Sequence, residues 1–232
     1  MAEQIITIDR LDQIKRSRPV DHRDNTATQL RNQLTQDGIT QWGLRIYRCT
    51  DGDDEAWQRF MDFFRERSTV HLRRLSAADL SSTLVWDVQE DASTLDGTSK
   101  AVVRDLYRQW VTQATGGIDP ASREALNPRY RFCVHVDEES LRSVLQYLDT
   151  RDSRVFEEGF VNLVQLEWIP ELHDPELGEE EDEELELEGL RLWDVGWLKT
   201  GLEYLYPSTY ELLYADEAWE LLYQRPPEIA MP

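Results

Sequence analysis

The chain has 232 residues and a formal charge of −21, from 46 acidic and 25 basic residues. A negative field of this size disfavours non-specific binding to nucleic-acid backbones and anionic membranes, and it favours a basic protein or a cationic small molecule as partner. No basic start leads into an apolar run, and no stretch approaches the ~20 apolar residues of a membrane span. We therefore expect a cytoplasmic monomer or homodimer without membrane contact.

Composition divides the chain into a core domain with extensions. Residues 1–41 are polar and show no sustained period, which indicates an N-terminal arm. Residues 42–170 hold the patterned strands and helices of an α+β core domain, and residues 190–232 form an aromatic-rich extension that we expect to pack on the core. Between them, residues 171–189 are an acidic loop, and this run of like charges predicts disorder or the recruitment of a basic partner.

The core begins with a strand, an acidic turn and a helix. Trp42, Leu44 and Ile46 alternate with other side chains, which is the period of a strand with one buried face. The DGDD turn at residues 51–54 ends this strand and caps the next helix. An apolar stripe at helical spacing follows the turn: Trp57, Phe60, Met61 and Phe64.

Further elements follow in chain order. Alternation and apolar content predict strands at residues 84–88, 130–136 and 160–169. Helical spacing predicts a helix over residues 99–114 and another after Asp137, which caps it. The capping box Ser208-x-x-Glu211 predicts a last helix over residues 209–223.

This order predicts a ferredoxin-like βαββαβ sandwich with a helical insertion at residues 99–117. We expect the first and third strands to lie adjacent and parallel at the centre of the sheet. Aligning Asp51 with Asp137 pairs three positions across these strands: Arg45 with Arg131, Tyr47 with Cys133, and Cys49 with His135. These six side chains would share the sheet face opposite the helices.

The candidate site is this open sheet face. Arg45, Tyr47, Arg131 and Cys133 are the candidate substrate-binding residues. Cys49 is a candidate catalytic nucleophile with His135 as its base, because a thiolate beside a base is an activated nucleophile. Alternatively, the C-terminal segment covers this face and the two cysteines are packing residues.

Ser99 is a second candidate nucleophile, because it lies at a helix start beside Lys100, although serine there is also an ordinary cap. We expect no metal and no cofactor. The four histidines (His22, His71, His135 and His173) have no metal-ligand spacing, and no glycine-rich phosphate cradle is present.

Several blocks of the core occur together: WGLRIYRCT with GDDEAWQRFM, then VWDVQED, LDGTSKAVVRDLYRQWV and PRYRFCVHVDEESL. Over residues 42–148 the chain resembles a large family of fungal proteins carried as hypothetical, which share the strand–GDDxxW, LDGxSKxxVR and RYRxC blocks. Some fungal proteins of similar size are arginine-containing cyclodipeptide synthases that use aminoacyl-tRNA. The resemblance brings no catalytic residues with it.

Two functions follow as hypotheses. In the first, the acidic surface recognises a basic partner or a cationic small molecule. In the second, the chain is an enzyme of fungal specialised metabolism that acts on an arginine-type substrate at the open sheet face, with tRNA as a partner. The arrangement of Arg45, Tyr47 and Cys49 distinguishes the two, because only the enzyme needs these residues to face a ligand.

Overall fold

In the computed structural model, which describes residues 26–118, 123–150, 159–170 and 185–232, six strands form one mixed sheet in the order β2-β1-β3-β4-β5-β6. The strands are β1 (Arg45–Arg48), β2 (Asp87–Gln89), β3 (Phe132–Val136), β4 (Phe160–Gln165), β5 (Trp197–Gly201) and β6 (Ile229–Ala230). β1 is parallel to both β2 and β3, β4 is antiparallel to β3 and β5, and β6 is parallel to β5.

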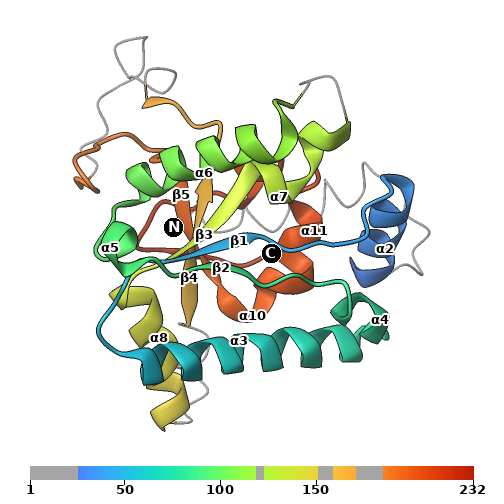
Figure 1. Cartoon of the computed structure of the whole chain (residues 1–232), viewed down its shortest axis with the longest axis horizontal. Helices are drawn as coiled ribbons and strands as arrows, with labels where there is room; N and C mark the ends of the chain where they lie inside the picture. Colours follow the sequence, from blue (N-terminus) through green and yellow to red (C-terminus); the bar gives the residue numbers. More distant parts are fainter. Residues whose placement is uncertain (1–25, 119–122, 151–158, 171–184) are drawn as a thin grey trace, which may run out of the picture.

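Helices cover both faces of this sheet (Figure 1). The longer ones are α2 (Thr26–Gln36), α3 (Asp54–Arg74), α6 (Lys100–Thr115) and α8 (Glu138–Thr150). The shorter ones are α4 (Ala78–Ser81), α5 (Ala92–Leu95), α7 (Pro128–Arg131), α10 (Leu202–Tyr204), α11 (Tyr210–Leu212) and α12 (Ala218–Leu222), with a 3-10 turn η1 (Arg123–Leu126) and a π-helical segment η4 (Leu205–Thr209). Among the described residues, no helix combines the length and apolar character that crossing a membrane requires.

The predicted strand–turn–helix at the start of the core is confirmed. Asp53 caps α3 by accepting a hydrogen bond from the Ala56 amide at 2.8 Å, and the predicted apolar stripe of this helix is buried. α3 packs against one face of the sheet together with α8, which starts after Asp137 as predicted.

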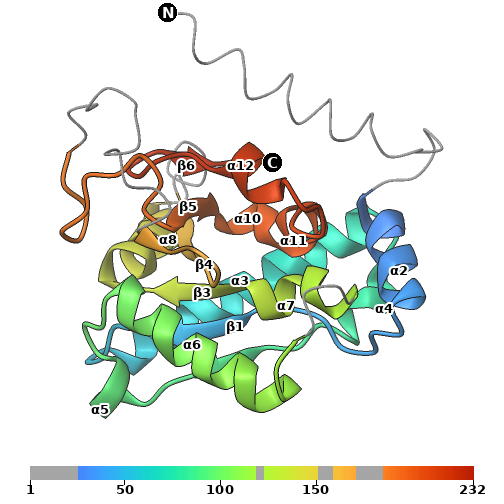
Figure 2. The same cartoon turned by 90° about the horizontal axis from the view of Figure 1, so that it is seen from above.

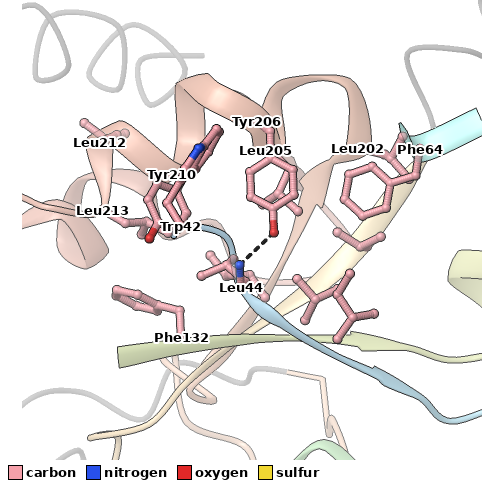
Figure 3. Packing of buried hydrophobic residues seen from close by; sticks show 14 of the residues in the cluster. Trp42, Leu44, Phe64, Phe132, Leu202, Leu205, Tyr206, Tyr210, Leu212 and Leu213 are labelled. Carbon is pink, nitrogen blue, oxygen red and sulfur yellow. Dashed lines mark hydrogen bonds between the residues drawn. The ribbon is translucent and has the colours of Figure 1, made fainter. Parts of the chain in front are cut away.

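Aromatic side chains from the C-terminal segment fill the larger core on that same face (Figure 3). The Tyr206 hydroxyl accepts a hydrogen bond from the backbone N–H of Leu44 at 2.8 Å. Trp42 packs edge-on against Tyr206 and Tyr210, with ring centroids 5.5 and 5.1 Å apart. Residues 190–232 therefore do more than pack on the core, because they also supply β5 and β6 to the sheet. The single helix predicted over residues 209–223 is instead the end of η4 and two short helices, α11 and α12.

The strand order differs from that of a ferredoxin-like sandwich, and we correct this prediction. A ferredoxin-like sheet is antiparallel, with its second strand beside the third and its fourth beside the first. Here β2 lies beside β1, with which it pairs in parallel from Arg45 with Asp87 to Tyr47 with Gln89, and β4 lies beside β3. The parallel β1–β3 pair was predicted correctly but belongs to another topology.

Strands β2-β1-β3 have the order of a doubly wound α/β sheet. α3 lies between β1 and β2 in the chain and covers one face, whereas α6 lies between β2 and β3 and covers the other (Figures 1 and 2). α6 is therefore a crossover connection and not an insertion. The two crossovers diverge at a switch point between β1 and β3, and ligands of such sheets bind outside the carboxyl ends of the strands there.

Candidate functional site

The sheet face that the sequence predicted to be open is covered by α6. Tyr47, Cys49 and Cys133 are at most 4% exposed and belong to an apolar cluster with side chains of this helix, among them Val103 and Tyr107. Figure 2 shows α6 on one side of β1 and β3, and α10 and α11 on the other. The predicted substrate-binding face is thus a second core.

The register of β1 against β3 differs from the predicted one by two residues. Arg45 is opposite Cys133 and Tyr47 is opposite His135, where the sequence predicted Arg131 and Cys133. A shift of two residues keeps every side chain on its predicted face, because strand side chains alternate with a period of two. The prediction that Arg45, Tyr47, Cys133 and His135 share a face is therefore confirmed despite the wrong register.

Neither cysteine lies in surroundings that favour a thiolate. Burial, together with the nearby Asp137, raises the pKa of Cys49 to about 12, and burial raises the pKa of Cys133 well above its ordinary value. Both thiols are free and buried. A reactive cysteine needs partial exposure and positive surroundings, so this environment favours the packing alternative.

Arg45 pairs with a residue that the sequence analysis did not select. Its guanidinium lies 3.1 Å from Asp87 and 4.4 Å from the ring centroid of Trp110. Arg129 shares both contacts, at 2.8 Å from Asp87 and 5.4 Å from Trp110. Arg45 and Arg129 therefore share one partner, and the half-buried carboxylate of Asp87 partly balances their charge.

Arg131 lies elsewhere. It ends the short helix α7, and its guanidinium donates to the carbonyls of Leu213 and Ala215 at 3.2 and 3.4 Å. Asn127 caps this helix and Pro128 begins it, so the chain enters β3 only at Phe132. Arg131 thus anchors the C-terminal segment and does not join Arg45.

A network of buried polar side chains, which we name the switch-point network, lies at the carboxyl end of β3. It consists of His135, Asp137, Asn162 and Lys100. The Lys100 ammonium donates to Asp137 at 2.9 Å, and the Asn162 amide donates to the same carboxylate oxygen at 3.0 Å. Burial opposes the charge of Asp137, but Lys100 and the Ser140 backbone N–H outweigh it and lower its pKa to about 2.

His135 is held neutral in a defined tautomer. One ring nitrogen, Nε2, is 2.8 Å from the Thr98 carbonyl, which can only accept, so Nε2 carries the proton. Nδ1 then accepts from the Asn162 amide at 3.4 Å. Burial lowers the pKa of His135. Ser99 caps α6 by accepting from the Val102 amide at 3.4 Å, which is the structural role given as the alternative to a nucleophile.

A surface turn reaches into this network. Leu187 and Leu190 exchange two backbone hydrogen bonds of 2.8 and 2.9 Å, and Glu188 and Gly189 form the tip of the turn with φ of +49° and +86°. The Glu188 carboxylate is 2.9 Å from the Lys100 ammonium. Lys100 therefore lies between two carboxylates. Burial opposes the charge of its ammonium, but the two carboxylates outweigh burial and raise its pKa.

A separate hollow of about 350 Å³ lies outside the end of β4. We name it the aromatic hollow, and its lining is aromatic and acidic without any basic side chain: Gln165, Glu167, Trp168, Trp193, Asp194, Trp219, Glu220 and Tyr223. Trp193 is 60% exposed, whereas Trp168 and Trp219 are each 3% exposed. The hollow therefore has a fixed aromatic base and one exposed ring at its wall.

Hydrogen bonds hold the wall in place. Asp194 accepts from the Trp219 indole N–H at 2.8 Å and from the Gly196 amide at 2.7 Å. The Tyr223 hydroxyl donates to the Trp193 carbonyl at 2.7 Å. These contacts join α12 to the segment before β5, so the hollow depends on residues that are distant in sequence.

Arg104 supports the aromatic base from behind. Its guanidinium lies 4.7 Å from the Trp168 ring and donates to the carbonyls of Gln165 and Gly196, each at 2.8 Å. Burial lowers the pKa of Arg104 to about 10. Helical spacing predicts a helix that contains Arg104, but no local pattern indicates that its charge lies against Trp168.

No protein-family model, curated protein or solved structure matches the chain. Its class is therefore defined by the fold alone, a mixed α/β protein with a six-stranded sheet. Within the described ranges, no three His, Cys, Asp or Glu side chains are grouped so that they could hold a metal ion.

Proposed function

We propose that the protein recognises a cationic group in the aromatic hollow, presented by a basic protein or a cationic small molecule. The observation that carries this proposal is the lining itself, with four aromatic and three acidic side chains and no base. A cation over an aromatic face gains about 0.5–1 kcal/mol at exposed sites and more when it loses water. Carboxylates at the rim add attraction without requiring a buried charge.

Two of the three carboxylates are free to contact a ligand. Asp194 is engaged by Trp219 and Gly196, as described above, and so serves the wall of the hollow. Glu167 and Glu220 are both exposed. A ligand cation can therefore lie on the aromatic rings while its N–H groups face these two glutamates.

Exposed apolar side chains near the hollow favour a polypeptide over a small molecule. Ile169, which follows Trp168, is 42% exposed, and Leu185 is 79% exposed. Arg225 links Leu185 to the hollow, because it donates to the Leu185 carbonyl at 2.6 Å and to the Leu192 carbonyl, next to Trp193, at 3.1 Å. An extended polypeptide can contact these side chains together with the hollow, whereas a small cation in the hollow cannot.

Titration calorimetry with an arginine-containing peptide and with methylguanidinium tests the proposal. We expect both to bind, and we expect Trp193→Ala to weaken the binding of each by about two- to fivefold, because its exposed ring contributes about 0.5–1 kcal/mol. Glu220→Gln should weaken binding several-fold at low salt and less at high salt, since exposed charges are screened. Glu217→Gln is the matched control, because it removes the same charge from an exposed residue outside the lining.

Equal affinities for the Trp193→Ala variant and the unchanged protein would contradict the proposal. So would a wild-type protein that binds neither probe. If the peptide binds and methylguanidinium does not, the cation has no role in recognition, and the site is an apolar one.

A further inference from the structure

We propose that the switch point between β1 and β3 is a binding site for a small carboxylate ligand, and that the Glu188 side chain occupies the place of that ligand. This site shares no residue with the lining of the aromatic hollow. The proposal does not depend on the function assigned to the hollow.

The position is the first reason. Lys100 is the first residue of α6, a helix of 16 residues, and this helix begins at the carboxyl end of β1, where the Gly97 amide donates to the Cys49 carbonyl at 3.2 Å. The positive end of the helix therefore lies at the switch point, where doubly wound sheets bind ligands. An anion there gains from the helix terminus as well as from the ammonium.

The chemistry of Lys100 is the second reason. The residue is 8% exposed, and its ammonium has one permanent partner, Asp137, which belongs to the strand–helix junction itself. Its other carboxylate partner, Glu188, is supplied by a surface turn and keeps 31% of its side chain exposed. The buried ammonium of Lys100 thus has one carboxylate partner from the core and a second from the surface turn.

The backbone of Glu188 is the third reason. Its φ of +49° is a conformation that non-glycine residues other than Asn and Asp rarely adopt, and such residues cluster at ligand sites and switches. Gly189 follows it, so a glycine was available one position away. The turn therefore holds a carboxylate-bearing residue at a position that glycine would fill with less strain.

Unused hydrogen-bonding groups are the fourth reason. The Trp197 ring lies 4.4 Å from the Lys100 ammonium, and its indole N–H has no acceptor among the described residues. Trp197 is 5% exposed and Asn162 is 1% exposed, and the Asn162 carbonyl oxygen also lacks a partner there. Buried polar groups of this kind usually have partners, and a carboxylate oxygen supplies the acceptor that the Trp197 indole N–H lacks.

A carboxylate ligand therefore competes with Glu188 in the same molecule. A tethered group acts at a high effective concentration, commonly in the millimolar range or above, so the unchanged protein binds free carboxylate weakly. Removing the Glu188 carboxylate opens the site. Two variants do this differently, since Glu188→Gln keeps the size of the side chain and Glu188→Gly also relieves the positive φ.

Acetate is the probe, and lysine amides are the reporters. The chain holds three lysines, Lys15, Lys100 and Lys199, so a protein labelled with 15N-lysine gives three backbone amide signals. We expect acetate to move the Lys100 signal saturably in Glu188→Gln and Glu188→Gly, at concentrations about tenfold lower than in the unchanged protein.

Chloride at equal ionic strength separates specific binding from screening, and Lys100→Gln in the Glu188→Gln background should abolish the acetate response. A Lys100 signal that does not respond to acetate in either folded Glu188 variant overturns the proposal. An equal response to chloride overturns it as well, because the site would then not distinguish a carboxylate. Neither result bears on the aromatic hollow, which is tested with cations.

Discussion

Gly196 allows a sharp test of how the aromatic hollow is built. Its φ is +72°, and a Cβ at this position would lie 2.4 Å from the Trp168 ring and from the Arg104 guanidinium. Gly116, at the end of α6, has nearly the same φ of +71° and nothing within 4 Å of such a Cβ. The two glycines therefore share the backbone requirement and differ in the space around them.

We expect Gly116→Ala to lower the free energy of unfolding by about 1–2 kcal/mol, the cost of a left-handed residue. Gly196→Ala carries that cost and also an overpacking cost of about 1–3 kcal/mol, because Trp168 and Arg104 are both buried. For a chain of this size the extra cost lowers Tm by roughly 2–12 °C relative to Gly116→Ala. It also displaces Trp168, so affinity for methylguanidinium should fall only in Gly196→Ala.

Urea denaturation and thermal unfolding of both variants measure the difference. The reasoning is refuted if the two variants unfold at the same urea concentration and bind methylguanidinium equally well. That result would mean that Trp168 and Arg104 can move away from an added Cβ without any loss of stability, contrary to their close packing against Gly196.

Three further predictions concern the second core and the switch-point network. In the folded protein, Cys49 and Cys133 should react with a thiol reagent far more slowly than after unfolding, because burial raises both pKa values. Asp137 should contribute about 2 kcal/mol of stability that is present above pH 4 and is lost as the pH falls towards 2, because its pKa is lowered to about 2. His135→Gln should flatten the loss of stability below pH 6.5, because the lowered pKa of His135 makes only the unfolded state take up a proton there.

Each of these has its own control. Fast thiol labelling under native conditions would show that the second core opens easily. Asp137→Asn should remove the acid-dependent contribution of Asp137, and an unchanged profile would place the titration elsewhere. A His135→Gln variant that keeps the wild-type slope between pH 6.5 and 5 would show that His135 is already protonated in the fold.

Local pattern was sufficient for the longer elements of the core domain and for the faces of its strands. It was not sufficient for residues 190–232, where the helix predicted over residues 209–223 is divided and β5 and β6 were not predicted. The alternation around Leu44 and Ile46 placed those residues in the main core, and the same alternation put Tyr47 and Cys133 together on the other face. Strand side chains alternate with a period of two, so a register error of two residues leaves each side chain on the correct face. The grouping was therefore correct although the individual pairs were not.

Strand order could not be obtained in this way. The position of β2 depends on the pairing of Trp42 with Leu84, a contact between distant residues that no local periodicity records. Without this pairing, the sequence predicts α6 as an insertion and the sheet face beneath it as open. The Asn127-Pro128 start of α7 was a local signal, and it would have placed Arg131 outside the strand.

The aromatic hollow could not be predicted from the sequence for the same reason. Its walls come from the end of β4, from the segment before β5 and from α12, and the contacts among Trp168, Asp194 and Trp219 depend on the fold. Composition predicts only that a partner is positively charged, because an excess of carboxylates favours cations. The site itself required the three-dimensional arrangement.

The sheet ends on both sides in very short strands, since β2 has three residues and β6 has two. A long border strand exposes backbone N–H and C=O groups on which a second chain can continue the sheet. Here there is little backbone for such lateral growth, and a partner peptide cannot gain many main-chain hydrogen bonds by extending the sheet. The recognition proposed for the aromatic hollow therefore relies on side chains, and concentrated solutions of the protein should resist β-sheet aggregation at these borders.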